Sequence, residues 1–109
     1  MERRLSPRVA VRLPVAQVVA DVAKGRAEIT DLSENGLCVE PLEGEVFDDG
    51  PFAWLEVVLP ADQDSGGPIR ALGELCGRRD RQRSYRIKYI YPRDRRRYEA
   101  YVRTLARVG

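Results

Sequence analysis

Six short segments of strand-forming sequence, separated by turn residues, limit what this chain of 109 residues can fold into. In Phe52–Leu59, every second position from Ala53 onward is apolar, so one face of a strand is hydrophobic. Short strands at this spacing favour a small antiparallel barrel. The predicted strands are Val15–Val22, Arg26–Ser33, Gly36–Glu40, Phe52–Leu59, Ile69–Gly77 and Ser84–Tyr91.

Two dipeptides mark the first turns of this pattern. Lys24-Gly25 predicts the turn between the first two strands, and Asn35-Gly36 is a strong hairpin signal after the second strand. Because strand side chains alternate, we expect Asp31 and Ser33 on the same face as Ile29.

The C-terminal segment has helical periodicity. Pro92 ends the last strand, and Arg93–Arg107 carries an apolar stripe at the spacing of one helix face, formed by Tyr98, Tyr101, Val102 and Leu105. We expect Trp54 outside the barrel core, packed under this helix. The sequence thus predicts a mainly β protein with one domain, residues 1–109, made of an arginine arm (1–9), a barrel (15–91) and a C-terminal α-helix (93–107).

The chain contains no histidine, which argues against several classes of enzyme and metal site. Without imidazole, Ser33 lacks the commonest activating base. Cys38 and Cys76 indicate neither a disulfide framework nor a zinc site. No apolar run reaches the roughly 20 residues of a membrane span, and the start does not resemble a secretory signal. We therefore predict a cytoplasmic protein that is not an enzyme, binds no metal and does not insert into membranes.

Acidic and basic residues are unevenly distributed. No lysine or arginine occurs between Ala27 and Ile69, whereas acidic residues are frequent there. The basic residues near both ends are almost all arginine, which suits planar anions, although a GC-rich genome would produce the same bias. We interpret the acidic middle and the helix face as candidate surfaces for a protein partner, and Arg78–Arg83 as a solvated turn that does not bind nucleic acid.

Arginines near the N-terminus and polar residues of the second strand predict a ligand site. Guanidinium groups of Arg3, Arg4 and Arg8 match phosphates and the O6/N7 edge of guanine. Asp31 and Ser33 can bond the remaining edge of a purine. Together these residues predict a site for a guanine nucleotide.

The order of these motifs resembles the PilZ domain family, whose members are bacterial receptors for the second messenger cyclic di-GMP. The matching residues are R-x-x-x-R from Arg4 to Arg8, preceded by Arg3, and D-x-S-x-x-G with Asp31, Ser33 and Gly36. The resemblance covers nearly the whole chain and implies a six-stranded antiparallel β-barrel with a C-terminal helix. It also implies that these six residues bind cyclic di-GMP and that a downstream protein partner reads the signal.

Each motif also has a simpler interpretation. The arginines could form a solvated tail, Asp31 and Ser33 could satisfy backbone groups of the hairpin, and Gly36 could be a turn residue with positive φ. The alternative function is a PilZ-like interaction adaptor that does not need the nucleotide. Some proteins resembling this family lack the motif residues, whereas this chain retains them, which favours the receptor.

The arm generates a first testable prediction. It has many charges and few apolar side chains, and nothing local offsets an ordering cost of about 1–2 kcal/mol per residue. Bonds from the three arginines to the ligand could offset that cost. Amide hydrogen exchange at Leu5, Ser6 and Arg8 should be fast without cyclic di-GMP and slow with it. Strong protection in the free protein would contradict this mechanism.

Overall fold

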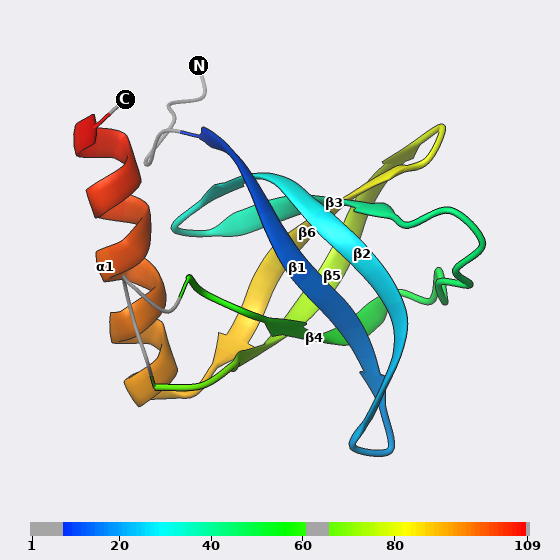
Figure 1. Cartoon of the computed structure of the whole chain (residues 1–109). Coiled ribbons are helices and arrows are strands. Elements are labelled where there is room, and N and C mark those ends of the chain that lie inside the picture. The colour runs from blue at the N-terminus through cyan, green and yellow to red at the C-terminus, as the bar shows by residue number, and fades with distance from the viewer. Residues whose placement is uncertain (1–7, 61–65, 109) are drawn as a thin grey trace.

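The chain forms a closed six-stranded antiparallel barrel with one helix packed beside it (Figure 1). The computed structural model describes residues 8–60 and 66–108. Around the barrel the strands follow the order β1-β2-β3-β6-β5-β4, and pairing of β4 with β1 closes the sheet. The elements are β1 (Val9–Val19), β2 (Val22–Ser33), β3 (Gly36–Pro41), β4 (Phe52–Val57), β5 (Ile69–Arg79), β6 (Gln82–Ile90) and α1 (Pro92–Val108). The predicted fold class is confirmed.

The first hairpin differs from the prediction. β1 begins at Val9, and the turn lies at Ala20-Asp21, whose φ values are 52° and 65°. Two consecutive positive φ angles match the twist of a tight hairpin. The predicted turn residue Gly25 lies inside β2, where an added Cβ would stand 2.4 Å from the carbonyl oxygen of Val46. Gly25 is therefore required for the close approach of a distant loop.

An extra residue in β2 changes which side chains face the core. Ile29 pairs with Val39 and Asp31 pairs with Cys38, so Thr30 has no counterpart on β3. Such a bulge shifts the alternation by one position. Ile29 and Leu32 are both fully buried, whereas Asp31 remains partly exposed. The prediction that Asp31 shares the face of Ile29 is wrong.

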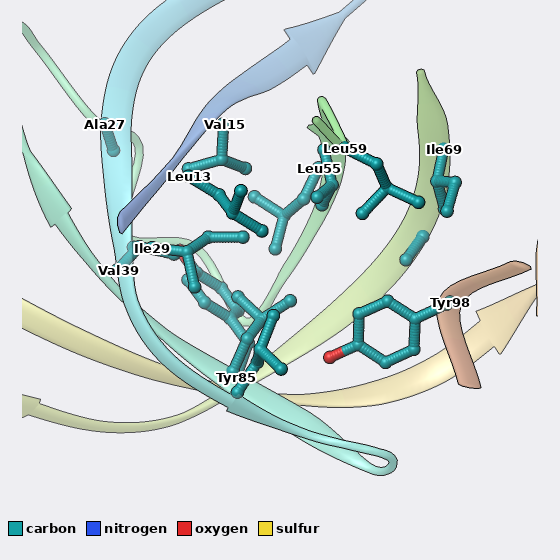
Figure 2. Packing of buried hydrophobic residues seen from close by; sticks show 14 of the residues in the cluster. Leu13, Val15, Ala27, Ile29, Val39, Leu55, Leu59, Ile69, Tyr85 and Tyr98 are labelled. Atoms are coloured by element: carbon teal, nitrogen blue, oxygen red, sulfur yellow. The ribbon is translucent and has the colours of Figure 1, made fainter. Parts of the chain in front are cut away.

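The hydrophobic core fills the barrel and extends to α1 (Figure 2). The predicted helical stripe is confirmed, because Tyr98, Tyr101 and Val102 are buried and Leu105 is partly buried against the same cluster. Within the described residues, no helix has the length and hydrophobicity needed to cross a bilayer. The described residues also contain no group of three or more side chains placed to ligate a metal.

Trp54 lies outside the core, as predicted. It pairs across the sheet with Leu72, which in turn pairs with Tyr89. The Trp54 ring centroid lies 6.5 Å from that of Tyr89 and 6.4 Å from that of Tyr91. The indole therefore packs in an aromatic cluster beside the start of α1.

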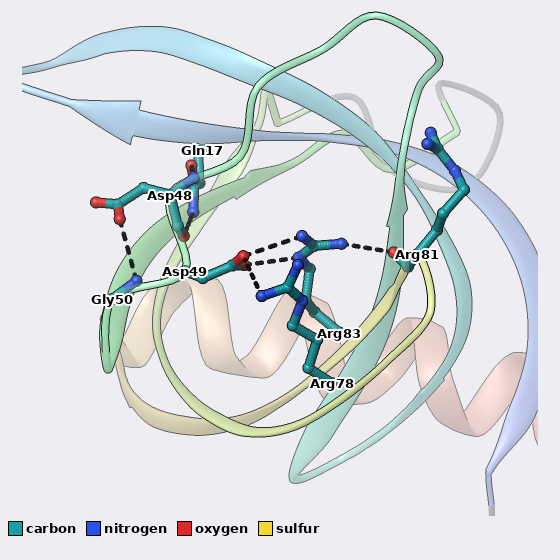
Figure 3. Close-up of polar contacts among 7 residues, drawn as sticks. All are labelled: Gln17, Asp48, Asp49, Gly50, Arg78, Arg81 and Arg83. Carbon is teal, nitrogen blue, oxygen red and sulfur yellow. Dashed lines mark hydrogen bonds and ion pairs between the residues drawn. The ribbon is translucent and has the colours of Figure 1, made fainter.

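The loop between β3 and β4 lies on the side of the barrel away from α1 and is held by buried polar groups (Figures 1 and 3). Arg83 is 8% exposed and donates to both carboxylate oxygens of Asp49, at 2.7 and 3.0 Å. Arg78 lies 3.1 Å from the same carboxylate. The buried Gln17 side chain donates to the Asp48 carbonyl and accepts from the Asp48 N–H. Arg78–Arg83 is therefore more than a solvated turn.

Folding pairs the acidic middle of the chain with arginines from elsewhere in the sequence. The pairs are Arg8–Asp31, Arg12–Glu28, Arg26–Glu45, Arg70–Glu56, Arg78–Asp49, Arg81–Glu40, Arg83–Asp49 and Arg103–Glu34. The acidic segment seen in the sequence is thus largely charge-compensated in three dimensions. Its described part does not form a uniformly acidic surface.

The Asp49–Arg83 contact predicts how stability responds to acid. The hydrogen bond from Arg83 lowers the pKa of Asp49 below its ordinary value. The stability that Asp49 contributes is therefore complete above the unfolded pKa and is lost as pH falls from about 5 through the lower native pKa. Asp49→Asn should lower the melting temperature at pH 7. The difference in melting temperature between this variant and the parent protein should shrink toward pH 3.

Glu43→Gln provides the matched control, because Glu43 is exposed and the substitution also removes one negative charge. The melting temperature of this control variant should match that of the parent protein across the pH range. A difference between Asp49→Asn and the parent that stays constant from pH 7 to pH 3 would contradict the assignment.

Candidate functional site

The β2–β3 hairpin carries the candidate site, and its turn consists of Glu34 and Asn35. Ser33 pairs with Gly36 across the turn, and the Asn35 N–H donates to Ser33 Oγ at 3.4 Å. The Asn35 carbonyl accepts the Ile87 N–H at 2.9 Å, which joins the turn to β6. The predicted hairpin is present, with the turn one residue earlier than the Asn-Gly pair indicates.

Gly36 has a different role from the expected one. Its φ is not positive, and it is the first residue of β3. A Cβ built at this position would lie 2.7 Å from the carbonyl oxygen of Tyr85 on β6. The glycine is required because two backbones approach closely here, and the interpretation as a left-handed turn residue is wrong.

Arg8 and Asp31 meet although 23 positions separate them in the sequence. β1 pairs with β2 from Val9 opposite Leu32, which brings the preceding Arg8 to the end of β2. Arg8 Nη1 donates to Asp31 Oδ1 at 2.7 Å. The two side chains remain 42% and 32% exposed, so both are accessible to a ligand. Arg3 and Arg4 lie outside the described residues.

Ser33 is placed differently from Asp31. It is 8% exposed, and its hydroxyl oxygen already accepts the Asn35 N–H. The hydroxyl proton of a serine can still be donated. Ser33 thus stabilises the turn and retains one donor for a ligand.

Residues of α1 that sequence reasoning did not assign to the site contact the same turn. Tyr98 is 1% exposed, and its hydroxyl lies 2.7 Å from the Ser33 carbonyl and 3.2 Å from that of Gly36. Burial raises the pKa of Tyr98 well above its ordinary value, and the positive charges of Arg8 and Arg95 offset only part of this rise. The hydroxyl therefore stays protonated and donates. Helical periodicity identified Tyr98 as a core residue, but no sequence signal indicated where its hydroxyl points.

Arg103 also reaches the turn. Arg95, Glu99 and Arg103 stand four residues apart along the helix, and Arg95 lies 3.3 Å from Glu99. Arg103 Nη1 instead lies 3.6 Å from Glu34 Oε2. The helix thus contacts both the buried carbonyls and the exposed carboxylate of the turn.

A groove of about 530 Å³ is lined by residues of β1, β2 and β3, of the β3–β4 loop and of the β5–β6 turn, and its lining contains none of the predicted site residues. Its lining includes Glu28, Glu40 and Glu43, and its arginines, Arg12 and Arg81, are paired with two of these glutamates. This groove offers a dianion little attraction.

Comparison with known structures identifies the architecture. No protein-family profile and no curated protein matches the sequence. The PilZ domain of Escherichia coli YcgR with c-di-GMP superposes with a TM-score of 0.74 at 17% identity, covering 98% of this chain and 94% of that chain. This chain has the fold of a PilZ domain.

Two longer proteins contain the same PilZ fold. Bacillus subtilis inhibitor of motility (MotI/DgrA) has a TM-score of 0.77 at 18% identity, covering 100% of this chain and 54% of that chain. Escherichia coli YcgR in complex with c-di-GMP has a TM-score of 0.68 at 22% identity, and the match covers 99% of this chain and 48% of that chain. This chain therefore spans about half the length of each of these two.

The close approach at Gly36 generates a prediction about stability. Gly36→Ala should lower the free energy of unfolding by about 1–3 kcal/mol, because the methyl group must displace backbone. Gly77→Ala is the matched control in β5, since its Cβ would lie 4.0 Å from its nearest neighbour, Ser84 Cβ. That change should be neutral or stabilising by up to about 1 kcal/mol. Urea unfolding of both variants measures the difference, and equal effects would contradict the role of Gly36.

Proposed function

We propose that this chain binds cyclic di-GMP and relays its presence to a protein partner. The proposed ligand-binding residues are Arg3, Arg4, Arg8, Asp31, Ser33 and Gly36. The observation that carries the proposal is the meeting of the two motifs at Arg8 and Asp31, on an accessible part of a PilZ fold. The similar structures of YcgR that contain c-di-GMP support the choice of ligand.

The chemistry of the ligand matches the groups at this site. Cyclic di-GMP has two phosphates and two guanines, so arginines can engage phosphate oxygens and the O6/N7 edge of a base. Asp31 would accept hydrogen bonds from guanine N–H groups, and Ser33 would donate its hydroxyl proton. Gly36 contributes by keeping β3 close to β6, which fixes the hairpin.

The Arg8–Asp31 ion pair does not prevent binding. Both groups are partly exposed, and an exposed ion pair contributes only about 0–1 kcal/mol. A ligand that supplies a phosphate for Arg8 and an N–H donor for Asp31 replaces this pair at small cost. Ligand binding would then draw the arm against β2 and create the surface that a partner reads.

The second candidate function is an interaction adaptor that needs no nucleotide. The observation favouring it is that Arg8 and Asp31 already satisfy one another. The two candidates differ in one measurable property, because only the receptor binds cyclic di-GMP specifically. No catalytic role is proposed for either candidate.

Calorimetry of the purified protein with cyclic di-GMP, GTP and cyclic di-AMP tests the proposal. We expect a dissociation constant for cyclic di-GMP in the micromolar range or below, equivalent to about −8 kcal/mol or stronger. Arg8→Ala and Asp31→Ala should each weaken binding by roughly 10- to 150-fold, the effect of losing a charge-assisted hydrogen bond. The fold should remain intact in both variants, because the side chains are partly exposed.

Arg26→Ala is the matched control for these variants. Arg26 is also exposed and pairs with a glutamate, Glu45, but it lies five residues before Asp31 in β2. Its loss should leave affinity unchanged. Absence of heat at high micromolar cyclic di-GMP, or equal binding of GTP, would favour the adaptor and reject the receptor.

A further inference from the structure

The turn of the candidate site is attached to α1 by a buried hydrogen-bond donor. The Tyr98 hydroxyl lies within hydrogen-bond distance of both the Ser33 and the Gly36 carbonyls. These carbonyls flank the turn on β2 and β3, so a single side chain ties together the two ends of the turn. Removing the hydroxyl would leave buried acceptors without this donor, which is costly in a protein interior.

A second, exposed contact joins the same two elements. Arg103 lies one and a half turns of helix beyond Tyr98 and contacts the Glu34 carboxylate in the turn itself. On the other side, the Asn35 carbonyl is held by β6. The turn is therefore fixed from the helix and from the sheet, and Asp31 and Ser33 stand at the end of the strand that leads into it.

We propose that Tyr98 is a positioning residue for the ligand site and couples the site to α1. Its hydroxyl holds the hairpin in the geometry in which Ser33 and Asp31 face the ligand. The identity of the ligand in this inference rests on the proposed function. The contact between Tyr98 and the turn does not depend on any ligand. The coupling makes α1 the element whose stability changes when the site is occupied.

The direction of the coupling follows from linkage. If Tyr98 stabilises the binding-competent hairpin, a ligand that selects this hairpin must also stabilise the docked helix, by the same factor. Exchange of the α1 amides should therefore slow when ligand binds. Any ligand of the native state slows the amides that exchange by global unfolding, so the coupling is shown by slowing in α1 that exceeds the slowing in the barrel strands.

The experiment compares Tyr98→Phe with two controls. Tyr89→Phe removes the hydroxyl of a half-exposed tyrosine on the outside of the barrel. Val57→Ala creates a cavity in β4, which pairs with β1 and β5 and is not adjacent to the hairpin. Val57→Ala thus lowers stability without touching the turn, and separates a positioning effect from a general loss of stability.

Amide hydrogen exchange of the free proteins is the first readout, and it needs no ligand. Tyr98→Phe should accelerate exchange at Glu34, Asn35 and Gly36 relative to the rest of the barrel, and neither control should do so. Uniform acceleration throughout the protein, or no change at the turn, would overturn the proposal.

Titration with cyclic di-GMP is the second readout. We expect Tyr98→Phe to weaken binding about two- to tenfold, the effect of one neutral hydrogen bond, and to abolish the slowing of exchange in α1 that exceeds the slowing in the barrel strands. Both controls should bind as the parent does. Binding weakened equally by Val57→Ala would overturn the positioning role. If the parent protein does not bind, the proposed ligand is wrong, and the exchange of the free proteins still decides whether Tyr98 sets the turn.

Discussion

One extra residue in β2 determines the side of the barrel to which the functional groups belong. Thr30 has no counterpart on β3, so the alternation that buries Ala27 and Ile29 continues at Leu32. Without this bulge, Asp31 would face a closed hydrophobic interior, where an unpaired carboxylate is very costly. With it, the carboxylate is outside and within reach of Arg8. The candidate site therefore depends on a local irregularity of the strand.

The closed barrel converts an uneven sequence into a balanced structure. Arginines near the two ends of the chain are brought beside acids of the middle, because β1 pairs with β2 and β4, and β6 pairs with β3 and β5. Arg83 shows the strongest case, with a buried guanidinium bonded to both oxygens of Asp49. Most of these ion pairs are exposed and contribute little to stability individually. Among the described residues, their effect is to place an arginine beside most of the acids between Ala27 and Ile69.

Sequence reasoning succeeded where local pattern determines structure. The apolar alternation of β4 and the spacing of Tyr98, Tyr101 and Val102 were sufficient to predict a barrel and a helix. It failed where the cause is distant in the chain. The sequence predicts turn roles for Gly25 and Gly36. In the structure, each glycine is instead required because a distant carbonyl oxygen approaches it closely, that of Val46 at Gly25 and that of Tyr85 at Gly36. The motifs predicted that Arg8 and Asp31 lie together, and they do. The contact between Tyr98 and the turn depends on how the helix docks, which periodicity does not specify.

The attachment of the hairpin to α1 also has a consequence for the order of events during synthesis. Domains emerge from the ribosome N-terminal end first, at about 5–20 residues per second. The β2–β3 hairpin is complete in sequence at Pro41, but its partner strand β6 ends at Ile90 and its donor, Tyr98, follows later still. A nascent chain that contains both motifs therefore lacks the contacts that shape the site. The contacts that hold the hairpin therefore form only after α1 has been made, well after both motifs have been synthesised.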